Sequence, residues 1–222
     1  MYNPIRLPRN KHYGSNYWEG ISFKYDRIVS SYSNLEYDNW ILIETDPEII
    51  DYCEQPCKVN FVIGGKLKGT IFDMWLHHRL TGEEFIEVKY SNELKPGHKN
   101  YERNVEQIEV QKEWCAEQGV KHSIKTEQDI RKNRILLDNK KRILSFVKDT
   151  NIATLSFSEQ FIKYLTDQPT SFFTIAQWLP ELNVYQIHEL IFWHIYHGNV
   201  KSNIETVTLG NNTEVWTCRD KS

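Results

Sequence analysis

The sequence lacks any apolar run long enough to cross a membrane. None of its 222 residues belongs to a stretch of about 18 consecutive apolar residues, the minimum that a spanning helix needs. The first ten residues are polar in character and contain two prolines, unlike the apolar core of a secretory signal. We therefore expect a cytoplasmic protein.

The chain also has few cysteines and no net positive charge. The chain has four cysteines, which should be reduced thiols in this compartment: Cys53, Cys57, Cys115 and Cys218. Cys53 and Cys57 have no second Cys or His pair at zinc-finger spacing, which argues against a zinc site. The formal net charge of −3 argues against a globally basic nucleic-acid binder, but a local basic rim stays possible.

Periodic segments predict a first, α/β domain with mixed strands over residues 1–138. Residues 1–30 look irregular. They are either an arm that contacts DNA or a partner, or a strap whose aromatic side chains pack on the domain, and we favour the strap. The next strands, linked at Gly64-Gly65 and His78–Gly82 into a meander, are predicted at 57–63, 66–76 and 84–90. A short strand is predicted at 120–125, and helices at 33–44, 100–118 and 127–137.

Residues 139–222 predict a second, mostly helical domain of winged-helix type. Its helices are expected at 140–147, 156–165, 173–179 and 184–197, and extended segments at 200–203, 205–209 and 214–218. The apolar helix at 184–197 has no Lys or Arg from Tyr185 to His194. Because phosphate binding needs positive charge, this domain is expected to bind a protein partner rather than read DNA.

Asp73 is the main anomaly of the first domain. It lies within Thr70–Leu76, which otherwise reads as a strand buried on both faces, where an unpaired carboxylate is costly. The next strand places Glu87 and Lys89 on one face. If the intervening turn is symmetric about Leu80, Asp73 lies opposite Glu87, with Cβ atoms about 5 Å apart.

Such a pair of carboxylates with a lysine fits metal-assisted phosphodiester hydrolysis. The carboxylates repel each other, and a divalent cation relieves the repulsion. Mg²⁺ prefers oxygen ligands and activates water, while the Lys89 ammonium adds positive charge near the phosphate. Structural alternatives stay open: Asp73 as a buried carboxylate bonded to backbone or to Lys89, and Glu87 with Lys89 as a solvated sheet face. Glu36 is either a third carboxylate or only the glutamate of a helix capping box.

Asp73 and Glu87-Val88-Lys89, with thirteen residues between Asp73 and Glu87, resemble the PD-(D/E)xK motif of restriction-endonuclease-like nucleases. Phe72 departs from the pattern, because proline is common there. More of the chain resembles one branch, the TnsA endonuclease subunits of TnsABC-type heteromeric transposases. The segments that carry this resemblance are Ser33–Asp38, Asp46–Ile49, Glu54–Pro56, Asp73, Ile86–Lys89, Thr126–Arg131 and Leu136–Asn139.

The resemblance implies a restriction-endonuclease-like domain that cleaves DNA with a metal. The catalytic residues it implies are Glu36, Asp73, Glu87 and Lys89. The implied metal ligands are Asp73, Glu87, the main-chain carbonyl of Val88 and, as an open case, Glu36, around two Mg²⁺ ions that Mn²⁺ replaces. Such a subunit works in the bacterial cytoplasm and cuts the 5′ ends of a transposon during cut-and-paste transposition. Its partners would be a TnsB-like transposase and, through the C-terminal domain, a TnsC-like AAA ATPase.

Basic residues near the catalytic strands are candidate contacts to DNA phosphates, or equally solvated loop residues: Lys66, Lys68, Lys95, His98 and Lys99. Two other functions stay open. One is a free-standing nuclease of the same fold, such as a restriction enzyme or junction resolvase. The other is a non-catalytic winged-helix adaptor with a degenerate nuclease domain, against which the intact set of four catalytic residues argues.

Overall fold

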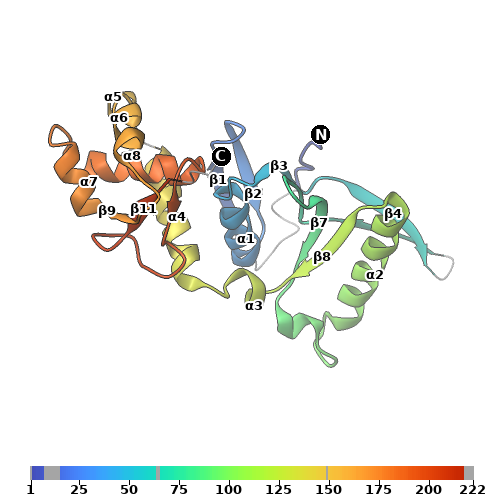
Figure 1. Cartoon of the computed structure of the whole chain (residues 1–222). Coiled ribbons are helices and arrows are strands. Elements are labelled where there is room, and N and C mark those ends of the chain that lie inside the picture. The colour runs from blue at the N-terminus through green and yellow to red at the C-terminus, as the bar shows by residue number, and fades with distance from the viewer. Residues whose placement is uncertain (1, 8–15, 64–65, 149, 218–222) are drawn as a thin grey trace. The chain divides into compact units, whose positions relative to one another are not determined.

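The computed structural model describes residues 2–7, 16–63, 66–148 and 150–217, without the side chains of residues 61–63 and 66 (Figure 1). The chain divides into two compact units. The first comprises Met1–Glu44 and Glu48–Lys132, and the second comprises Thr45–Pro47 and Asn133–Ser222.

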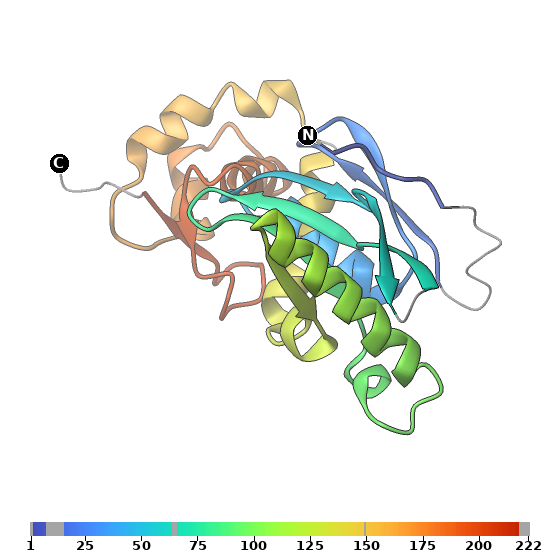
Figure 2. The same cartoon turned by 90° about the vertical axis from the view of Figure 1, so that its right-hand side faces the viewer.

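The first unit is built on a mixed four-stranded sheet of order β3-β6-β7-β8. Its strands are β3 (Ile49–Glu54), β6 (Met74–His78), β7 (Gly82–Val88) and β8 (Lys121–Lys125). The β3–β6 and β6–β7 pairs are antiparallel, while β7 and β8 run parallel, which requires a crossover between them. Helix α2 (Tyr101–Gln118) makes that crossover and lies across one face of the sheet (Figure 2). The predicted α/β fold with a mixed central sheet is confirmed.

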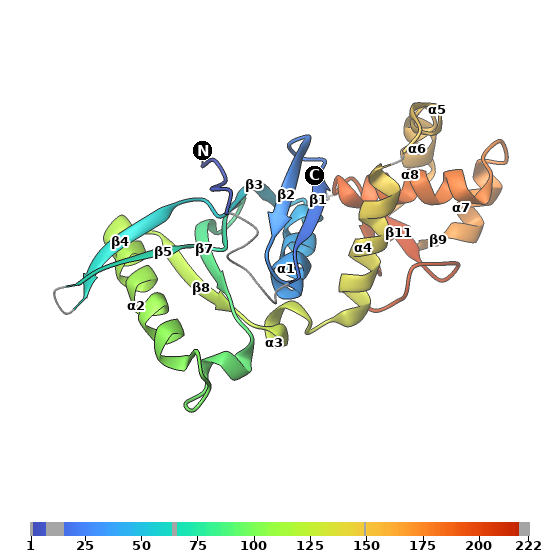
Figure 3. The same cartoon turned by 180° about the vertical axis from the view of Figure 1, so that it is seen from behind.

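Shorter elements surround this sheet. Two antiparallel hairpins are β1 (Trp18–Ser22) with β2 (Arg27–Ser31), and β4 (Lys58–Ile63) with β5 (Lys66–Ile71). The helices are α1 (Asn34–Glu44), the 3-10 helix η2 (Ser91–Leu94) and α3 (Glu127–Ile130). Helices α1 and α2 lie on opposite sides of β7 (Figures 1 and 3). Strand β7 is thus covered on both faces, which explains its nearly continuous burial.

Aromatic packing holds α2 to the sheet. Phe72 and Phe85 are fully buried, with ring centroids 4.7 Å apart, and Trp114 of α2 packs against both rings. Helix α2 ends at Gly119, whose φ of 68° is the left-handed conformation that glycine adopts without steric cost. The predicted helix at 100–118 and strand at 120–125 are confirmed to within one residue at each end.

The predicted strand at 66–76 is wrong. Strand β5 ends at Ile71 and β6 begins at Met74, and the two strands belong to different sheets, so there is no three-stranded meander. The chain bends at Phe72 and Asp73 because Phe72 turns fully into the core, with 0% of its side chain exposed. The Gly64-Gly65 turn lies outside the described residues.

The prediction of an irregular segment at 1–30 is also wrong, because β1 and β2 form a hairpin there. Gly20 lets β1 approach α1 closely, since a Cβ atom at Gly20 would lie 2.3 Å from the Trp40 ring. Of the aromatic residues that suggested a strap, Tyr17 packs against Tyr32 and Trp18 stacks on Tyr37, while Tyr13 lies outside the described residues.

The second unit contains five helices and one small sheet in its described residues. The helices are α4 (Arg134–Lys148), α5 (Ile152–Leu155), α6 (Ser158–Tyr164), α7 (Phe172–Trp178) and α8 (Val184–Tyr196). The sheet has the order β10-β11-β9, from β9 (Thr170–Ser171), β10 (Lys201–Ser202) and β11 (Glu214–Trp216).

Two helices were predicted wrongly around the domain boundary. The predicted helix at 127–137 is broken after Ile130, where α3 ends. Helix α4 runs without interruption through residues 138 and 139, which were predicted to separate two helices. The break has a local cause, because the Asn133 side chain accepts the Leu136 N–H at 3.0 Å and so caps the start of α4. The predicted domain boundary between residues 138 and 139 falls inside α4.

The predicted extended segment at 205–209 is wrong as well. Asn139, buried in the second unit, donates to the carbonyls of Ile204 and Val207 and accepts the Leu209 N–H. These bonds hold the segment as a series of turns, because they use backbone groups that a strand would pair with a neighbouring strand.

No helix in the described ranges combines the length and apolar character that a membrane crossing needs. The described cysteines, Cys53, Cys57 and Cys115, are free thiols, and Cys218 lies outside the described residues.

Candidate active site

The four predicted catalytic side chains line one cavity of about 350 Å³ in the first unit. Glu36 comes from the first turn of α1, and Asp73 from the bend before β6. Glu87 lies near the end of β7, and Lys89 directly follows that strand. The structure therefore brings these residues together, as expected, from separate elements. Their catalytic roles stay a prediction.

The predicted β6–β7 register is confirmed. Residues pair symmetrically about Leu80, from His78 with Gly82 to Met74 with Ile86. Asp73 lies one step beyond the last pair, and its Oδ2 accepts the Val88 N–H at 2.7 Å. The structural alternative for Asp73 predicted a hydrogen bond to the backbone, and this bond is present. The same Asp73 carboxylate also lines the cavity.

Glu87 is fully buried and held by three donors. Lys89 Nζ donates to its Oε1, Gln107 Nε2 also donates to Oε1 at 2.6 Å, and Gln111 Nε2 donates to Oε2 at 2.6 Å. The alternative of a solvated sheet face for Glu87 and Lys89 is therefore wrong. Gln111 is itself fully buried and also donates to Thr70 Oγ1 at 3.2 Å.

Gln107 and Gln111 are site residues that sequence reasoning missed. Their spacing of four residues on a predicted helix was the available signal, since it places both side chains on one helical face. Nothing in the sequence told which strand that face would meet.

Glu36 lies where both of its predicted roles, helix capping and a third carboxylate of the site, would place it. Its N–H donates to Ser33 Oγ at 3.0 Å, and its Oε2 accepts the N–H of Tyr32, the residue before the cap, at 2.8 Å. This is close to a capping box, with the carboxylate bonded one residue earlier than in the usual pattern. The same residue is partly exposed and lines the cavity beside Asp73.

Burial and the neighbouring Asp73 raise the pKa of both glutamates in the cavity. Burial, together with the negative charge of Asp73, raises the pKa of Glu36 to about 8 and the pKa of Glu87 to about 7. Burial lowers the pKa of Lys89, but the charges of Asp73, Glu87 and Glu36 outweigh it and hold the pKa above its ordinary value. Three carboxyl groups therefore surround one ammonium, and the raised pKa values of Glu36 and Glu87 mean that full ionisation of the cluster is unfavourable without a further cation.

A family model described as TnsA-like endonuclease N terminal matches residues 46–127. This segment is similar to the N-terminal domain of TnsA-like endonucleases. The matched TnsA-like segment contains Asp73, Glu87 and Lys89 but begins after Glu36. No curated protein matches the sequence. The TnsA-like domain supports a transposon-associated nuclease.

The donor chemistry of the TnsA-like site fits a hard divalent cation. Mg²⁺ needs one or two carboxylates, with water and phosphate as its other ligands. Asp73, Glu87 and Val88 line the cavity, and the ligands they could offer a cation are carboxylate and carbonyl oxygens. Among the described residues, no group of three or more His, Cys, Asp or Glu side chains is preassembled to hold an ion. Because Lys89 and Gln107 both donate to Glu87 Oε1, binding of a cation through that oxygen would require them to move.

Of the residues predicted to contact DNA, Lys68 is the one whose described side chain lines a cavity near the site. It pairs with Glu106 at 2.9 Å. The Lys66 side chain lies outside the described residues. The other predicted residues lie in the loop after η2 and do not line the catalytic cavity: Lys95, His98 and Lys99. Arg103, which sequence reasoning missed, does line it.

Proposed function

We propose that this chain is a Mg²⁺-dependent DNA endonuclease that cuts the 5′ ends of a transposon during cut-and-paste transposition. The observation that carries the proposal is the convergence of Asp73, Glu87 and Lys89, all within the TnsA-like segment, on one cavity that Glu36 also lines. An excess of carboxylates around one lysine is the charge pattern that a phosphodiesterase site with hard cations requires.

The residues would divide the chemistry among them. Asp73 and Glu87 would hold the cation through carboxylate oxygens, and the Val88 carbonyl would be a further ligand. When bound, Mg²⁺ lowers the pKa of water and offsets the charge that develops on the phosphate. Lys89 orients the attacking water and stabilises the same charge with its ammonium. Gln111 keeps the Glu87 carboxylate in place from α2.

The second unit would serve as the partner-binding part. Its order of elements, β9-α7-α8-β10-β11, with one three-stranded sheet, is compatible with a winged helix. Helix α8 buries most of its apolar side chains and has no Lys or Arg, which disfavours groove reading. We therefore propose that this unit binds a TnsC-like AAA ATPase. A TnsB-like transposase would cut the 3′ ends of the element.

Strand-resolved cleavage of transposon-end DNA tests the proposal, with and without the neighbouring transposase proteins. We expect Asp73→Ala and Lys89→Ala each to abolish 5′-end cutting in Mg²⁺ or Mn²⁺, with the fold checked by circular dichroism. Lys121→Ala is the matched control, because Lys121 also pairs with a glutamate of β7 but lies outside the cavity. Full Mg²⁺-dependent cutting by either site variant would contradict the assignment of Asp73 and Lys89 as catalytic residues.

The isolated chain should cut weakly, because the local positive charge near the site is modest. Robust, sequence-specific digestion by the chain alone would favour a restriction enzyme instead.

A further inference from the structure

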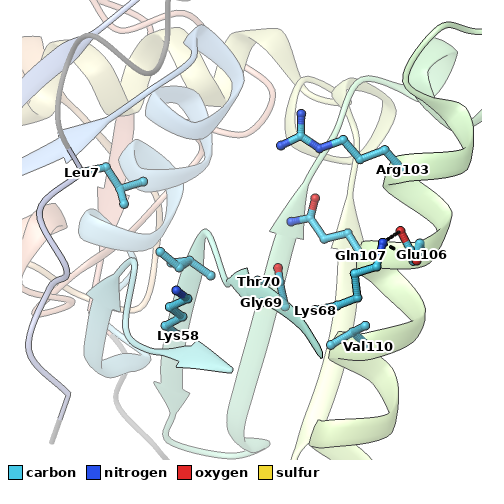
Figure 4. Close-up of a pocket in the computed structure, with 10 residues that line it drawn as sticks. Leu7, Lys58, Lys68, Gly69, Thr70, Arg103, Glu106, Gln107 and Val110 are labelled. Atoms are coloured by element: carbon cyan, nitrogen blue, oxygen red, sulfur yellow. Dashed lines mark hydrogen bonds and ion pairs between the residues drawn. The ribbon is translucent and has the colours of Figure 1, made fainter. Parts of the chain in front are cut away.

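A second, larger cavity adjoins the catalytic one. It has a volume of about 810 Å³ and lies between α2 and the β4–β5 hairpin (Figure 4). The two cavities share the lining residues Leu7, Ile71, Arg103 and Gln107. They are therefore neighbouring parts of one depression in the first unit, and we call the larger part the α2–β5 cavity.

Three cationic side chains line the α2–β5 cavity. Lys58 comes from β4, Lys68 from β5 and Arg103 from α2. Figure 4 shows Arg103 and Gln107 reaching from α2 on one side and Lys58 lying on the opposite side. The cavity thus has the opposite charge character to the carboxylate cluster of the catalytic cavity.

Arg103 and Lys58 are available to a ligand. Both are exposed, and neither has a hydrogen bond or ion pair with any residue in the described ranges. Lys68 differs, because Glu106 of α2 already neutralises it. An anion entering the cavity would therefore meet two uncompensated cations and one compensated cation.

Gly69 makes room for Lys58. A Cβ atom at Gly69 would lie 3.0 Å from Lys58 Cε and 2.8 Å from Asn60 Oδ1. The Lys58 side chain consequently lies close to the backbone of β5 at Gly69, where it lines the α2–β5 cavity.

We propose that the α2–β5 cavity binds backbone phosphates of the DNA strand that leads to the scissile phosphate, with Arg103 and Lys58 as the contacts. This inference rests on the proposed nuclease function and adds a DNA path to it. A phosphodiester that approaches the catalytic cavity is repelled by whichever of its carboxylates are ionised. Cations on the adjoining wall offset that repulsion and set the position of the strand.

The test is DNA binding by the full chain over a series of salt concentrations. The probe is a fluorescein-labelled transposon-end duplex, with Ca²⁺ in place of Mg²⁺ to suppress cutting. We expect Arg103→Ala and Lys58→Ala each to weaken binding and to reduce the slope of log affinity against log salt by about 0.9, the value for one lost phosphate contact. Glu106→Gln should tighten binding, because it frees Lys68.

Lys112→Ala is the matched control. Lys112 is exposed on α2 nine residues after Arg103, which is two and a half helical turns, so it faces the opposite side. Its substitution should leave the slope unchanged. Unchanged slopes for both Arg103→Ala and Lys58→Ala, with wild-type binding intact, would overturn the inference while leaving the nuclease assignment untouched. That assignment stands or falls on cleavage by Asp73→Ala and Lys89→Ala, which is measured separately.

Discussion

Replacing Lys89 with methionine removes the ammonium from a buried ion pair while keeping the side chain's length. Glu87 has no exposed side-chain surface, and only 16% of the Lys89 side chain is exposed. Removing one partner of such a pair leaves a buried charge and costs about 3–5 kcal/mol of stability while that charge persists. The charge persists only when Glu87 stays ionised, so the cost must depend on pH.

The pKa of Glu87 sets the pH window. Burial and Asp73 raise it to about 7, above the ordinary carboxyl range, so protonation stabilises the fold at low pH and this gain is lost as pH rises through about 7. Lys89 lowers this pKa, so its removal strengthens the pH dependence. We expect Lys89→Met to cost about 3 kcal/mol at roughly pH 8 but only about 1 kcal/mol, the value of one hydrogen bond, at roughly pH 5.5.

Hydrogen exchange of the β7 amides across a urea series measures this free energy in the metal-free protein, and reports the first unit by itself. Lys121→Met is the control. Lys121 pairs with Glu84, which lies in β7 like Glu87, but the Lys121 side chain is 56% exposed. Burial opposes ionisation of Glu84, but its hydrogen bonds and Lys121 outweigh burial and lower its pKa, so Glu84 stays ionised in both conditions. The control should lose at most about 1 kcal/mol at either pH. An equal loss at both pH values for Lys89→Met would refute the reasoning.

Two further substitutions test other parts of the first unit. Gln111→Leu should weaken Mg²⁺ binding by roughly 10–100-fold in calorimetric titrations, because Glu87 loses the donor that orients its Oε2; unchanged affinity would remove Gln111 from the site. Gly20→Ala should lower the free energy of unfolding by about 1–3 kcal/mol in urea, since the added methyl group would lie 2.3 Å from the Trp40 ring; an unchanged midpoint would mean that Trp40 shifts freely.

The sequence by itself determined the features that depend on near neighbours in the chain. The β6–β7 turn is symmetric about Leu80, so counting residues was enough to place Asp73 beside Glu87. Helix α2 and its Gly119 end follow from apolar periodicity and from glycine's tolerance of positive φ. These predictions held because the decisive interactions lie within one helix or one hairpin.

Only the tertiary structure decided where those elements meet. The bend at Asp73 depends on Phe72 entering an aromatic cluster built from several distant segments, and it overrides a sequence that reads as one continuous strand. Likewise, the packing of α2 on the sheet selects Gln107 and Gln111 as partners of Glu87. The physical reason is one of range. Local propensities amount to less than about 1 kcal/mol per residue, whereas burying a large side chain contributes about 1.5–3 kcal/mol and can be satisfied only by residues far away in the chain.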